Sequence, residues 1–235
     1  MADIDIRIIG QAGRITLNRP AALNALTYDM AMAIDAALLD WSVNPLVSLV
    51  IIDAVGERAF CAGGDIQHMY GTAKAGDFAF GRQFWADEYR LNARIFHFPK
   101  PFVAFMQGFN MGGGVGVSCH GSHRIVCENS QIAMPECSIG LVPDVGGSLL
   151  LARAPGRLGE YLGCTGARMS ASDAIYAGFA DYFIPQNAWN DLIQHLETTG
   201  NIELIDQAAQ PAPTSDLAQH QAWIDRHFAG TTIVD

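Results

Sequence analysis

The sequence predicts an α/β fold with a helical C-terminal part. Half of the 235 residues are hydrophobic and only 16% are charged, which is typical of a globular protein with a large core and not of a disordered chain. Short apolar runs alternate with helical patterns in the first part of the chain, and helical patterns dominate from Gly146 onward. We therefore expect a core domain over residues 1–185 and a helical C-terminal region over residues 186–235.

Several segments have the composition of β-strands. Residues 4–17 read as two short strands around a Gln-Ala-Gly turn. Residues 47–54 form a near-continuous apolar run with β-branched side chains, which suits a strand that is buried on both faces. The other expected strands are 102–106, 124–127, 131–134 and 180–184.

The expected helices are delimited by caps and by prolines. Asn24 or Thr27 is the expected cap of a first helix, which ends before Asn44-Pro45. A second helix is expected at 77–98, and Pro99 closes it. Further helices are expected to start at the glycine-rich run 112–116, at 146 and, after a proline-containing linker at 210–215, at 216.

Composition restricts the class of protein. The formal net charge of −10 argues against nucleic acid and anionic membrane as partners. The longest apolar stretch, 46–55, is too short to span a bilayer, and the N-terminus lacks the basic segment of a secretory signal. We expect a cytoplasmic location, or a mitochondrial-type location if a transit peptide has been removed. The cysteines form no C-x-x-C pair and are expected to be small buried side chains; they are Cys61, Cys119, Cys127, Cys137 and Cys164.

Two glycine clusters follow predicted strands. FCAGGD (60–65) comes after strand 47–54, and NMGGG (110–114) comes after strand 102–106. Glycines at such junctions let backbone N–H groups approach a ligand, and two such loops can hold an oxygen that becomes negative during a reaction. Tight turns alone are the plainer explanation of either cluster. Neither cluster has the ending of a Walker A phosphate loop, and the second lacks the G-x-G-x-x-G spacing of a dinucleotide site.

Three carboxylates are candidates for acid–base chemistry. Glu136 and Asp144 lie in an otherwise apolar loop, where burial would raise a carboxyl pKa toward the useful range. Asp144 can instead cap the helix expected at 146–153. Glu88 lies in a predicted helix, where a solvated position is the simpler explanation, and its neighbours Asp87 and Arg90 can pair at i, i+3.

Two histidines, His120 and His123, lie close together in the sequence SCHGSHR. Neither has an acidic or cysteine partner at a metal-binding spacing. We therefore expect no metal site.

Four motifs, in order and well spaced, carry a resemblance to a known family. They are ITLNRPAALNAL (15–26), AFCAGGDI (59–66), KPFVAFMQGFNMGGGVGVS (100–118) and AMPECSIGLVPDVGGS (133–148). Over residues 5–185 the chain resembles the enoyl-CoA hydratase/isomerase, or crotonase, family. The resemblance implies a crotonase fold, in which ββα units repeat along a spiral and a helical C-terminal region makes oligomer contacts. It also implies an acyl-coenzyme A thioester as substrate, no separate cofactor, and an oxyanion hole formed by the backbone N–H groups of Ala62 and Gly113.

Within this family, the sequence looks closest to the hydrolases of 3-hydroxyisobutyryl-CoA, which act in valine breakdown. A hydratase or a dienoyl isomerase resembling the usual type carries an acid where this chain has Gly116. In the hydrolase subfamily the residues matching Glu88, Gly113, Glu136 and Asp144 line the substrate site. The resemblance thus implies that Glu136 and Asp144 are catalytic and that Glu88 binds the substrate. An enoyl-CoA hydratase or isomerase, and a non-catalytic acyl-CoA-binding relative, are the alternatives.

The chain departs from the family in two places. Relatives often place a lysine near the nucleotide of the coenzyme where this chain has Ala21 and Ala22, and Arg19 or Arg58 can compensate. Hydrolases of this type are also usually longer, and residues 231–235 show no helix stop. We therefore expect a truncated C-terminal region.

Overall fold

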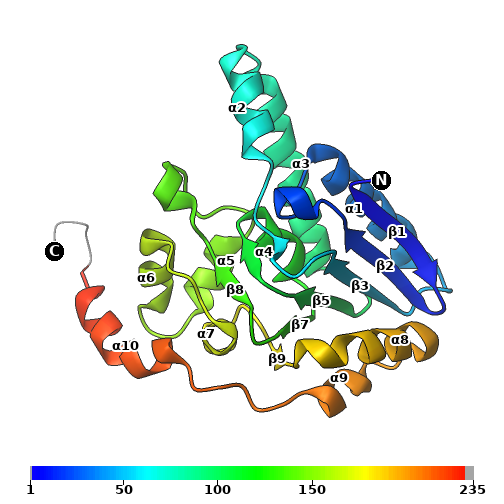
Figure 1. The fold of residues 1–235 in the computed structure, drawn as a ribbon. Helices are drawn as coiled ribbons and strands as arrows, with labels where there is room; N and C mark the ends of the chain where they lie inside the picture. Colours follow the sequence, from blue (N-terminus) through cyan, green and yellow to red (C-terminus); the bar gives the residue numbers. More distant parts are fainter. Residues whose placement is uncertain (1, 231–235) are drawn as a thin grey trace.

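A computed structural model describes residues 2–230. Residue 1 and residues 231–235 lie outside the described residues, and so does the expected truncation at the C-terminal end. Two β-sheets are surrounded by helices (Figure 1). The larger sheet has the strand order β1-β2-β3-β5-β7-β9, and the smaller sheet has the order β4-β6-β8. Strand β1 is antiparallel to β2, and the other pairings between named strands are parallel.

The strands of the larger sheet are β1 (Ile4–Ile9), β2 (Ala12–Leu17), β3 (Leu49–Ala54), β5 (Phe102–Met106), β7 (His123–Val126) and β9 (Tyr182–Phe183). Those of the smaller sheet are β4 (Ala59–Cys61), β6 (Phe109–Met111) and β8 (Gln131–Ala133). The helices are α1 (Tyr28–Val43), α2 (Ile66–Lys74), α3 (Phe78–Phe96), α4 (Gly113–Ser118), α5 (Gly147–Arg153), α6 (Leu158–Thr165), α7 (Ala171–Tyr176), α8 (Trp189–Thr199), α9 (Glu203–Ala208) and α10 (Asp216–His227). Short 3-10 helices are η1 (Pro20–Ala22), η2 (Glu136–Ile139) and η3 (Gln186–Ala188).

Successive strands alternate between the two sheets. Strands β3, β5 and β7 enter the larger sheet, and each is followed by a strand of the smaller sheet, β4, β6 or β8. Helices α2 and α3 follow the first pair, α4 follows the second, and η2 and α5 follow the third. This is the repeated ββα winding that was expected of the chain.

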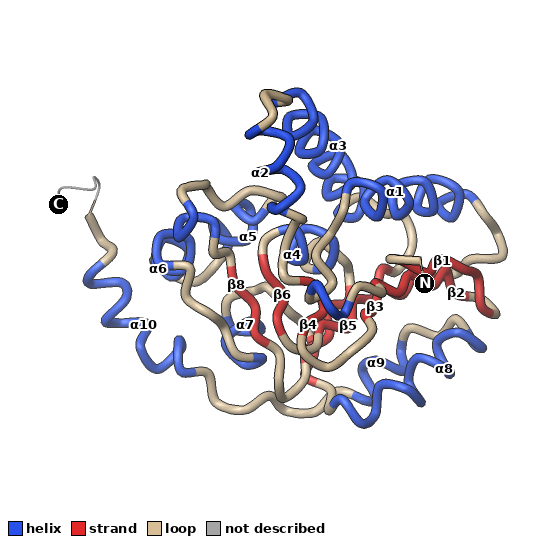
Figure 2. The backbone as a smooth tube through the Cα atoms, turned by 45° about the horizontal axis from the view of Figure 1, so that its top comes forward, coloured by secondary structure: helices blue, strands red, loops and turns tan. Residues whose placement is uncertain are grey.

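Strand β3 of the larger sheet is buried on both faces, as the apolar run 47–54 predicts. On one face Val50 and Ile52 belong to the main hydrophobic core, together with side chains of α1 and α3. On the other face Leu49 and Ile51 pack in a second core with α8 and α9 (Figure 2). Helix α10 packs instead on α6 and α7, so the region after residue 185 is divided between two packing sites.

Both long helices begin at a side-chain cap, of which the one at Thr27 was expected as an alternative to Asn24. The Thr27 side chain accepts a hydrogen bond from the Met30 N–H at the start of α1, and the Asp77 carboxylate caps α3 in the same way. Helix α3 buries a stripe of side chains with helical spacing, namely Phe84, Glu88, Leu91, Asn92 and Ile95. Two of these buried side chains are polar, which marks this face of α3 as part of a site.

Some expectations are not met. Strands β4 and β6 and helix α2 were not predicted. Cys61, Cys119 and Cys127 are buried as expected, whereas Cys137 and Cys164 are exposed, because they lie in η2 and on the outer side of α6. Within residues 2–230, no helix is long and apolar enough to cross a membrane.

Candidate active site

The three segments that carry candidate chemistry follow the three strands of the smaller sheet. Strand β4 leads into the first glycine cluster, β6 into the second, and β8 into the loop that begins with Met134 and holds Glu136. Since β4, β6 and β8 are parallel neighbours, their carboxyl ends meet at one edge of the sheet. Gly63 (φ 112°) and Gly112 (φ 50°) make the turns there, in a backbone region that favours glycine.

The backbone N–H groups of Gly64 and Gly113 are unpaired at this edge. The Ala62 N–H donates to the Leu23 carbonyl at 3.0 Å, so it is not available to a ligand. Neither the Gly64 nor the Gly113 N–H has an acceptor among residues 2–230. A Cβ added to Gly113 would lie 3.1 Å from the Gly64 nitrogen, which shows how closely the two backbones approach. The expectation that Ala62 supplies an oxyanion donor is therefore corrected, and the unpaired Gly64 N–H, which lies against Gly113, is the candidate donor of this loop.

Glu88 reaches the same loops from helix α3. Its Oε1 lies 2.8 Å from the position that a Cβ on Gly113 would take. The side chain is only 3% exposed, and Oε1 has no hydrogen-bond partner in the described part of the chain. Burial, together with the charge of Asp144, raises the pKa of Glu88 to about 8. A solvated position for Glu88 is thus wrong, while Asp87 does form the predicted ion pair with Arg90.

Glu136 is the first residue of η2, just after β8. Its Oε1 lies 2.7 Å from the position that a Cβ on Gly112 would take, so the carboxyl faces the second glycine loop. The side chain is buried, and its Oε2 is without a partner among the residues described. Burial raises the pKa of Glu136 to about 7, and the charge of Asp144 adds to this shift. A carboxyl with such a pKa can take or give a proton near neutral pH.

Asp144 does not cap a helix. Gly146 is the N-cap of α5 and makes no side-chain cap bond, whereas Asp144 Oδ2 accepts a hydrogen bond from the Tyr89 hydroxyl at 2.6 Å. The capping alternative is wrong for this reason. Through this hydrogen bond Asp144 lies against α3, beside the residue that follows Glu88.

Helix α4 has no room for a side chain at Gly116. A Cβ there would lie 2.7 Å from Asn92 Nδ2 and 2.8 Å from Val145 Cβ. Val145 holds the left-handed region (φ 46°), which is costly for a β-branched residue, and His120 Nε2 hydrogen-bonds the Val145 carbonyl at 2.8 Å. The place of a hydratase acid is thus filled by Asn92 and by a fixed loop.

A cavity of about 500 Å³ lies between α3 and the loop that holds Asp144. Asp144, Val145 and Asn92 line it, and the aromatic side chains Tyr89 and Phe96 of α3 form much of its wall. Apolar walls with a few convergent polar groups are typical of small-molecule sites.

The family follows from comparison with known proteins. The family model described as Enoyl-CoA hydratase/isomerase matches residues 12–235. The chain belongs to this family. It is 49% identical, over 95% of its length, to the mitochondrial 3-hydroxyisobutyryl-CoA hydrolase of Xenopus tropicalis, of which it spans 61%. Its fold matches a solved enoyl-CoA hydratase from Rhodobacter sphaeroides 2.4.1 (TM-score 0.95, 61% identity, 98% of this chain and 67% of that one). It also matches a carnitinyl-CoA dehydratase from Mycobacterium thermoresistibile (TM-score 0.96, 44% identity, 100% of this chain and 68% of that one).

These matches confirm the expected crotonase fold for this member of the enoyl-CoA hydratase/isomerase family. Two site residues were missed by sequence reasoning. Gly64 was overlooked because only the structure shows that Leu23 occupies the Ala62 N–H. Asn92 could have been predicted from the sequence, because it lies four residues after Glu88 and therefore on the same buried face of α3.

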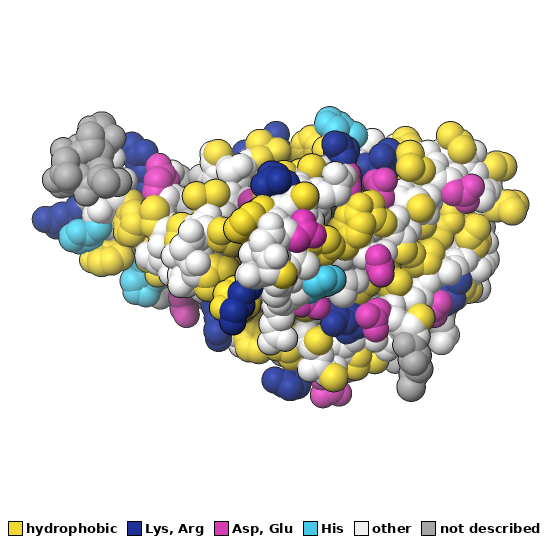
Figure 3. All heavy atoms as spheres, turned by 90° about the horizontal axis from the view of Figure 1, so that it is seen from above, with side chains coloured by type: hydrophobic (Ala, Val, Ile, Leu, Met, Phe, Trp, Pro, Cys, Tyr) yellow, Lys and Arg dark blue, Asp and Glu magenta, His cyan; other side chains and the backbone are white. Residues whose placement is uncertain are grey.

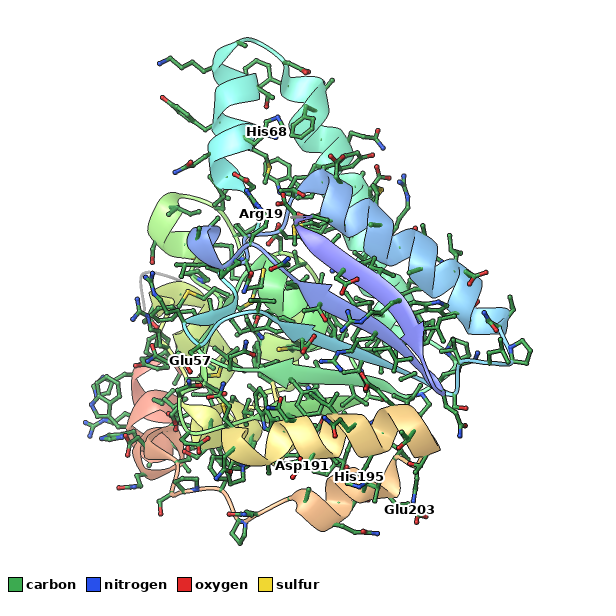
Figure 4. The ribbon with its side chains drawn as sticks, turned by 45° about the vertical axis from the view of Figure 1, so that its right-hand side comes forward. Arg19, Glu57, His68, Asp191, His195 and Glu203 are labelled. Atoms are coloured by element: carbon green, nitrogen blue, oxygen red, sulfur yellow. The ribbon has the colours of Figure 1, made fainter. Side chains whose placement is uncertain are left out.

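The two arginines considered for the coenzyme differ in availability. The Arg19 guanidinium, labelled in Figure 4, pairs with Asp65 at the start of α2 and with Asp3, and donates to the Ala25 carbonyl. The Arg58 side chain is exposed. Acidic and basic side chains are interspersed with hydrophobic ones on the face seen from above (Figure 3), so the net charge of −10 is not spread as one continuous acidic surface there. A role for either arginine stays a prediction.

The two histidines have other partners than a metal. His120 bonds the Val145 carbonyl, and the His123 ring stacks on Tyr182. Across residues 2–230, no group of three or more His, Cys, Asp or Glu side chains could hold a metal ion.

Proposed function

We propose that the protein to which this chain belongs hydrolyses the thioester of a β-hydroxyacyl-CoA, with 3-hydroxyisobutyryl-CoA as the first candidate. The products are free coenzyme A and the 3-hydroxy acid, as expected for a step of valine breakdown. One observation carries the proposal: Glu136 Oε1 approaches Gly112, the residue before the unpaired Gly113 N–H, while the position of a second hydratase acid, Gly116, is closed by Asn92 and Val145. The chain spans 61% of the curated hydrolase, so the activity is proposed for the whole protein.

The reaction starts at the thioester carbonyl. The carbonyl oxygen accepts hydrogen bonds from the Gly64 and Gly113 N–H groups, each of which contributes roughly 3–4 kcal/mol once the oxygen becomes negative. The Glu136 carboxylate attacks the carbonyl carbon, the C–S bond breaks and the coenzyme A thiolate leaves, so that a mixed anhydride remains. Water then cleaves the anhydride and regenerates Glu136. Alternatively, Glu136 takes a proton from a water that attacks the carbonyl carbon directly.

The remaining acids orient the substrate. We expect Asp144 and Glu88 to bond the hydroxyl of the acyl group, and Tyr89 holds the Asp144 carboxylate through its 2.6 Å hydrogen bond. Glu88, with a pKa raised to about 8, is largely protonated at neutral pH and can donate that bond.

Hydratase or isomerase activity is the rival within the family, and the names of two solved structures similar to this chain favour it. Hydration needs two acids around one water, and only Glu136 of that pair is present here. A non-catalytic acyl-CoA-binding protein is the third reading. It is disfavoured because Glu88 Oε1 and Glu136 Oε2 are buried without a hydrogen-bond partner among the described residues. Such groups lower the stability of the fold, and they are common where they bind or react with a substrate.

One assay separates the three readings. The purified full-length protein is given 3-hydroxyisobutyryl-CoA, and free thiol is followed with a thiol reagent; crotonyl-CoA is followed in parallel through its enoyl absorbance. We expect thiol release with the first substrate and no absorbance loss with the second. Absorbance loss without thiol release would establish the rival, and neither signal, with acyl-CoA binding retained, would establish the binding protein.

Two further expectations also remain proposals. We propose a homo-oligomer, which light scattering on the full-length protein tests directly. We further propose a cytoplasmic location, or a mitochondrial-type one if a transit peptide is removed, and localisation of a tagged full-length protein tests it.

A further inference from the structure

We propose that Asn92 determines specificity by hydrogen-bonding the hydroxyl group of the acyl substrate. The proposal rests on the hydrolase function proposed above and names a group that distinguishes hydroxyacyl from enoyl and unsubstituted acyl chains.

Asn92 occupies the site by its position on α3. It lies four residues after Glu88 and three after Tyr89, so the three side chains share one face of the helix. The side chain is 4% exposed and lines the 500 Å³ cavity beside Asp144. It therefore faces the space in which an acyl group would lie.

The Asn92 amide is buried with its hydrogen-bonding capacity unused. Neither Nδ2 nor Oδ1 has a partner within residues 2–230. Asn24, which is equally buried, is satisfied: its Nδ2 donates to the Val55 and Ala59 carbonyls, and its Oδ1 accepts from the Arg19 N–H. A buried amide without partners destabilises the fold, so such a group is expected to serve a ligand.

The chemistry of an amide selects a hydroxyl. Nδ2 donates and Oδ1 accepts, and a hydroxyl can do both in return. Nδ2 also lies 2.7 Å from the position of a Cβ on Gly116, so a neutral amide stands where a hydratase would carry an acid. An amide cannot take a proton from water, so this group holds a hydroxyl without adding or removing it. An enoyl chain offers no hydroxyl and would leave the amide unpaired, which a polar site of this kind disfavours.

The test is Asn92→Leu, which keeps the approximate volume and removes both polar atoms. kcat/KM is measured with 3-hydroxyisobutyryl-CoA and with isobutyryl-CoA, which lacks the hydroxyl. We expect a loss of about tenfold or more with the first substrate, as for an uncharged hydrogen bond, and little change with the second. Asn190→Leu, the same change at an exposed position of α8, is the control and should alter neither value.

A structural role gives a different result. Equal losses with both substrates, or no loss with either, would overturn the proposal. If Asn92→Leu unfolds on purification, Asn92→Ala is measured in the same way, after its folding has been checked by thermal melting.

A binding measurement separates this proposal from the proposed function. Non-hydrolysable thioether analogues of coenzyme A, with and without the hydroxyl, are titrated by calorimetry against the wild-type protein and Asn92→Leu. Wild-type preference for the hydroxylated analogue that is lost in the variant supports the role of Asn92 even if no thiol is released from the thioester. Equal affinity of the wild-type protein for both analogues contradicts that role even if hydrolysis is observed.

Discussion

The packing around Gly116 leaves no space for a side chain, so we expect even alanine to destabilise the fold there. A Cβ at this position would lie 2.7 Å from Asn92 Nδ2 and 2.8 Å from Val145 Cβ, closer than carbon atoms approach in proteins. Gly81 in α3 is the matched position, because its added Cβ would meet only Trp85, at 3.9 Å. Both glycines are helical, so Gly116→Ala and Gly81→Ala change helix propensity in the same direction.

The two alanine variants are expected to differ in their free energy of unfolding. Alanine gains roughly 0.5–1 kcal/mol over glycine within a helix, and this gain applies to Gly81→Ala in full. At Gly116 the extra methyl group overpacks the core, which costs about 1–3 kcal/mol. We therefore expect the free energy of unfolding of Gly116→Ala to lie about 1–3 kcal/mol below that of Gly81→Ala. Gly116→Glu should be less stable by a further few kcal/mol, because it buries a carboxyl without a partner.

Urea unfolding of the three variants, followed by circular dichroism, measures these differences. Enoyl absorbance with crotonyl-CoA shows in parallel whether Gly116→Glu has gained hydratase activity, and we expect none. Equal stabilities of Gly116→Ala and Gly81→Ala would refute the claim that the position is closed. So would a folded Gly116→Glu that hydrates crotonyl-CoA.

Other predictions address the acids and the oxyanion donors. Gly113→Ala should lower kcat for thioester hydrolysis about 10²–10³-fold, because the methyl group would meet Glu88 Oε1 at 2.8 Å and displace one donor; unchanged kcat would exclude the donor role. Hydrolysis should rise with pH through about 7, where Glu136 ionises, and Asp144→Asn should move this limb to lower pH because it removes a negative charge; a pH–rate profile that does not move contradicts the coupling. Since the pKa values of Glu88 and Glu136 are raised above 4.5, the folded state binds more protons than the unfolded one between about pH 4.5 and 8. The free energy of unfolding should therefore fall as pH rises through this window, and Glu88→Gln should flatten the fall in a pH series of urea titrations. Tyr89→Phe should reduce kcat/KM about tenfold, as for one lost hydrogen bond, with the fold intact by thermal melting; an unchanged value would show that Tyr89 does not position Asp144.

The long elements could be predicted from the sequence because their signals are local. Thr27 and Asp77 cap the two long helices, and the apolar run 47–54 indicates a strand that is buried on both faces. Strands β4 and β6 have only three residues each, which is too few for an alternating pattern to be visible. Their partners come from distant parts of the chain, so pairing rather than local sequence decides that they are strands.

The site was predicted in outline but not in its hydrogen bonds. The motifs single out Glu136 and the two glycine loops, but the smaller sheet whose edge they share was not expected. Which N–H is free depends on a contact from Leu23 to Ala62, between segments almost forty residues apart, and no spacing rule reveals it. The role of Asp144 likewise depends on Tyr89 of another helix, which the sequence alone does not bring near.

In the proposed function, Glu136 performs hydrolysis of a hydroxyacyl thioester at the Gly64 and Gly113 N–H groups. Glu136→Gln tests it most directly, with Glu160→Gln, at an exposed helical carboxylate that pairs with Arg157, as the matched control. The measurement is the initial rate of thiol release from 3-hydroxyisobutyryl-CoA by each variant and by the wild-type protein. We predict a loss of about 10²–10⁴-fold for Glu136→Gln with melting temperature retained, and no loss for Glu160→Gln. Full hydrolytic rate in a folded Glu136→Gln protein would contradict the catalytic role of Glu136.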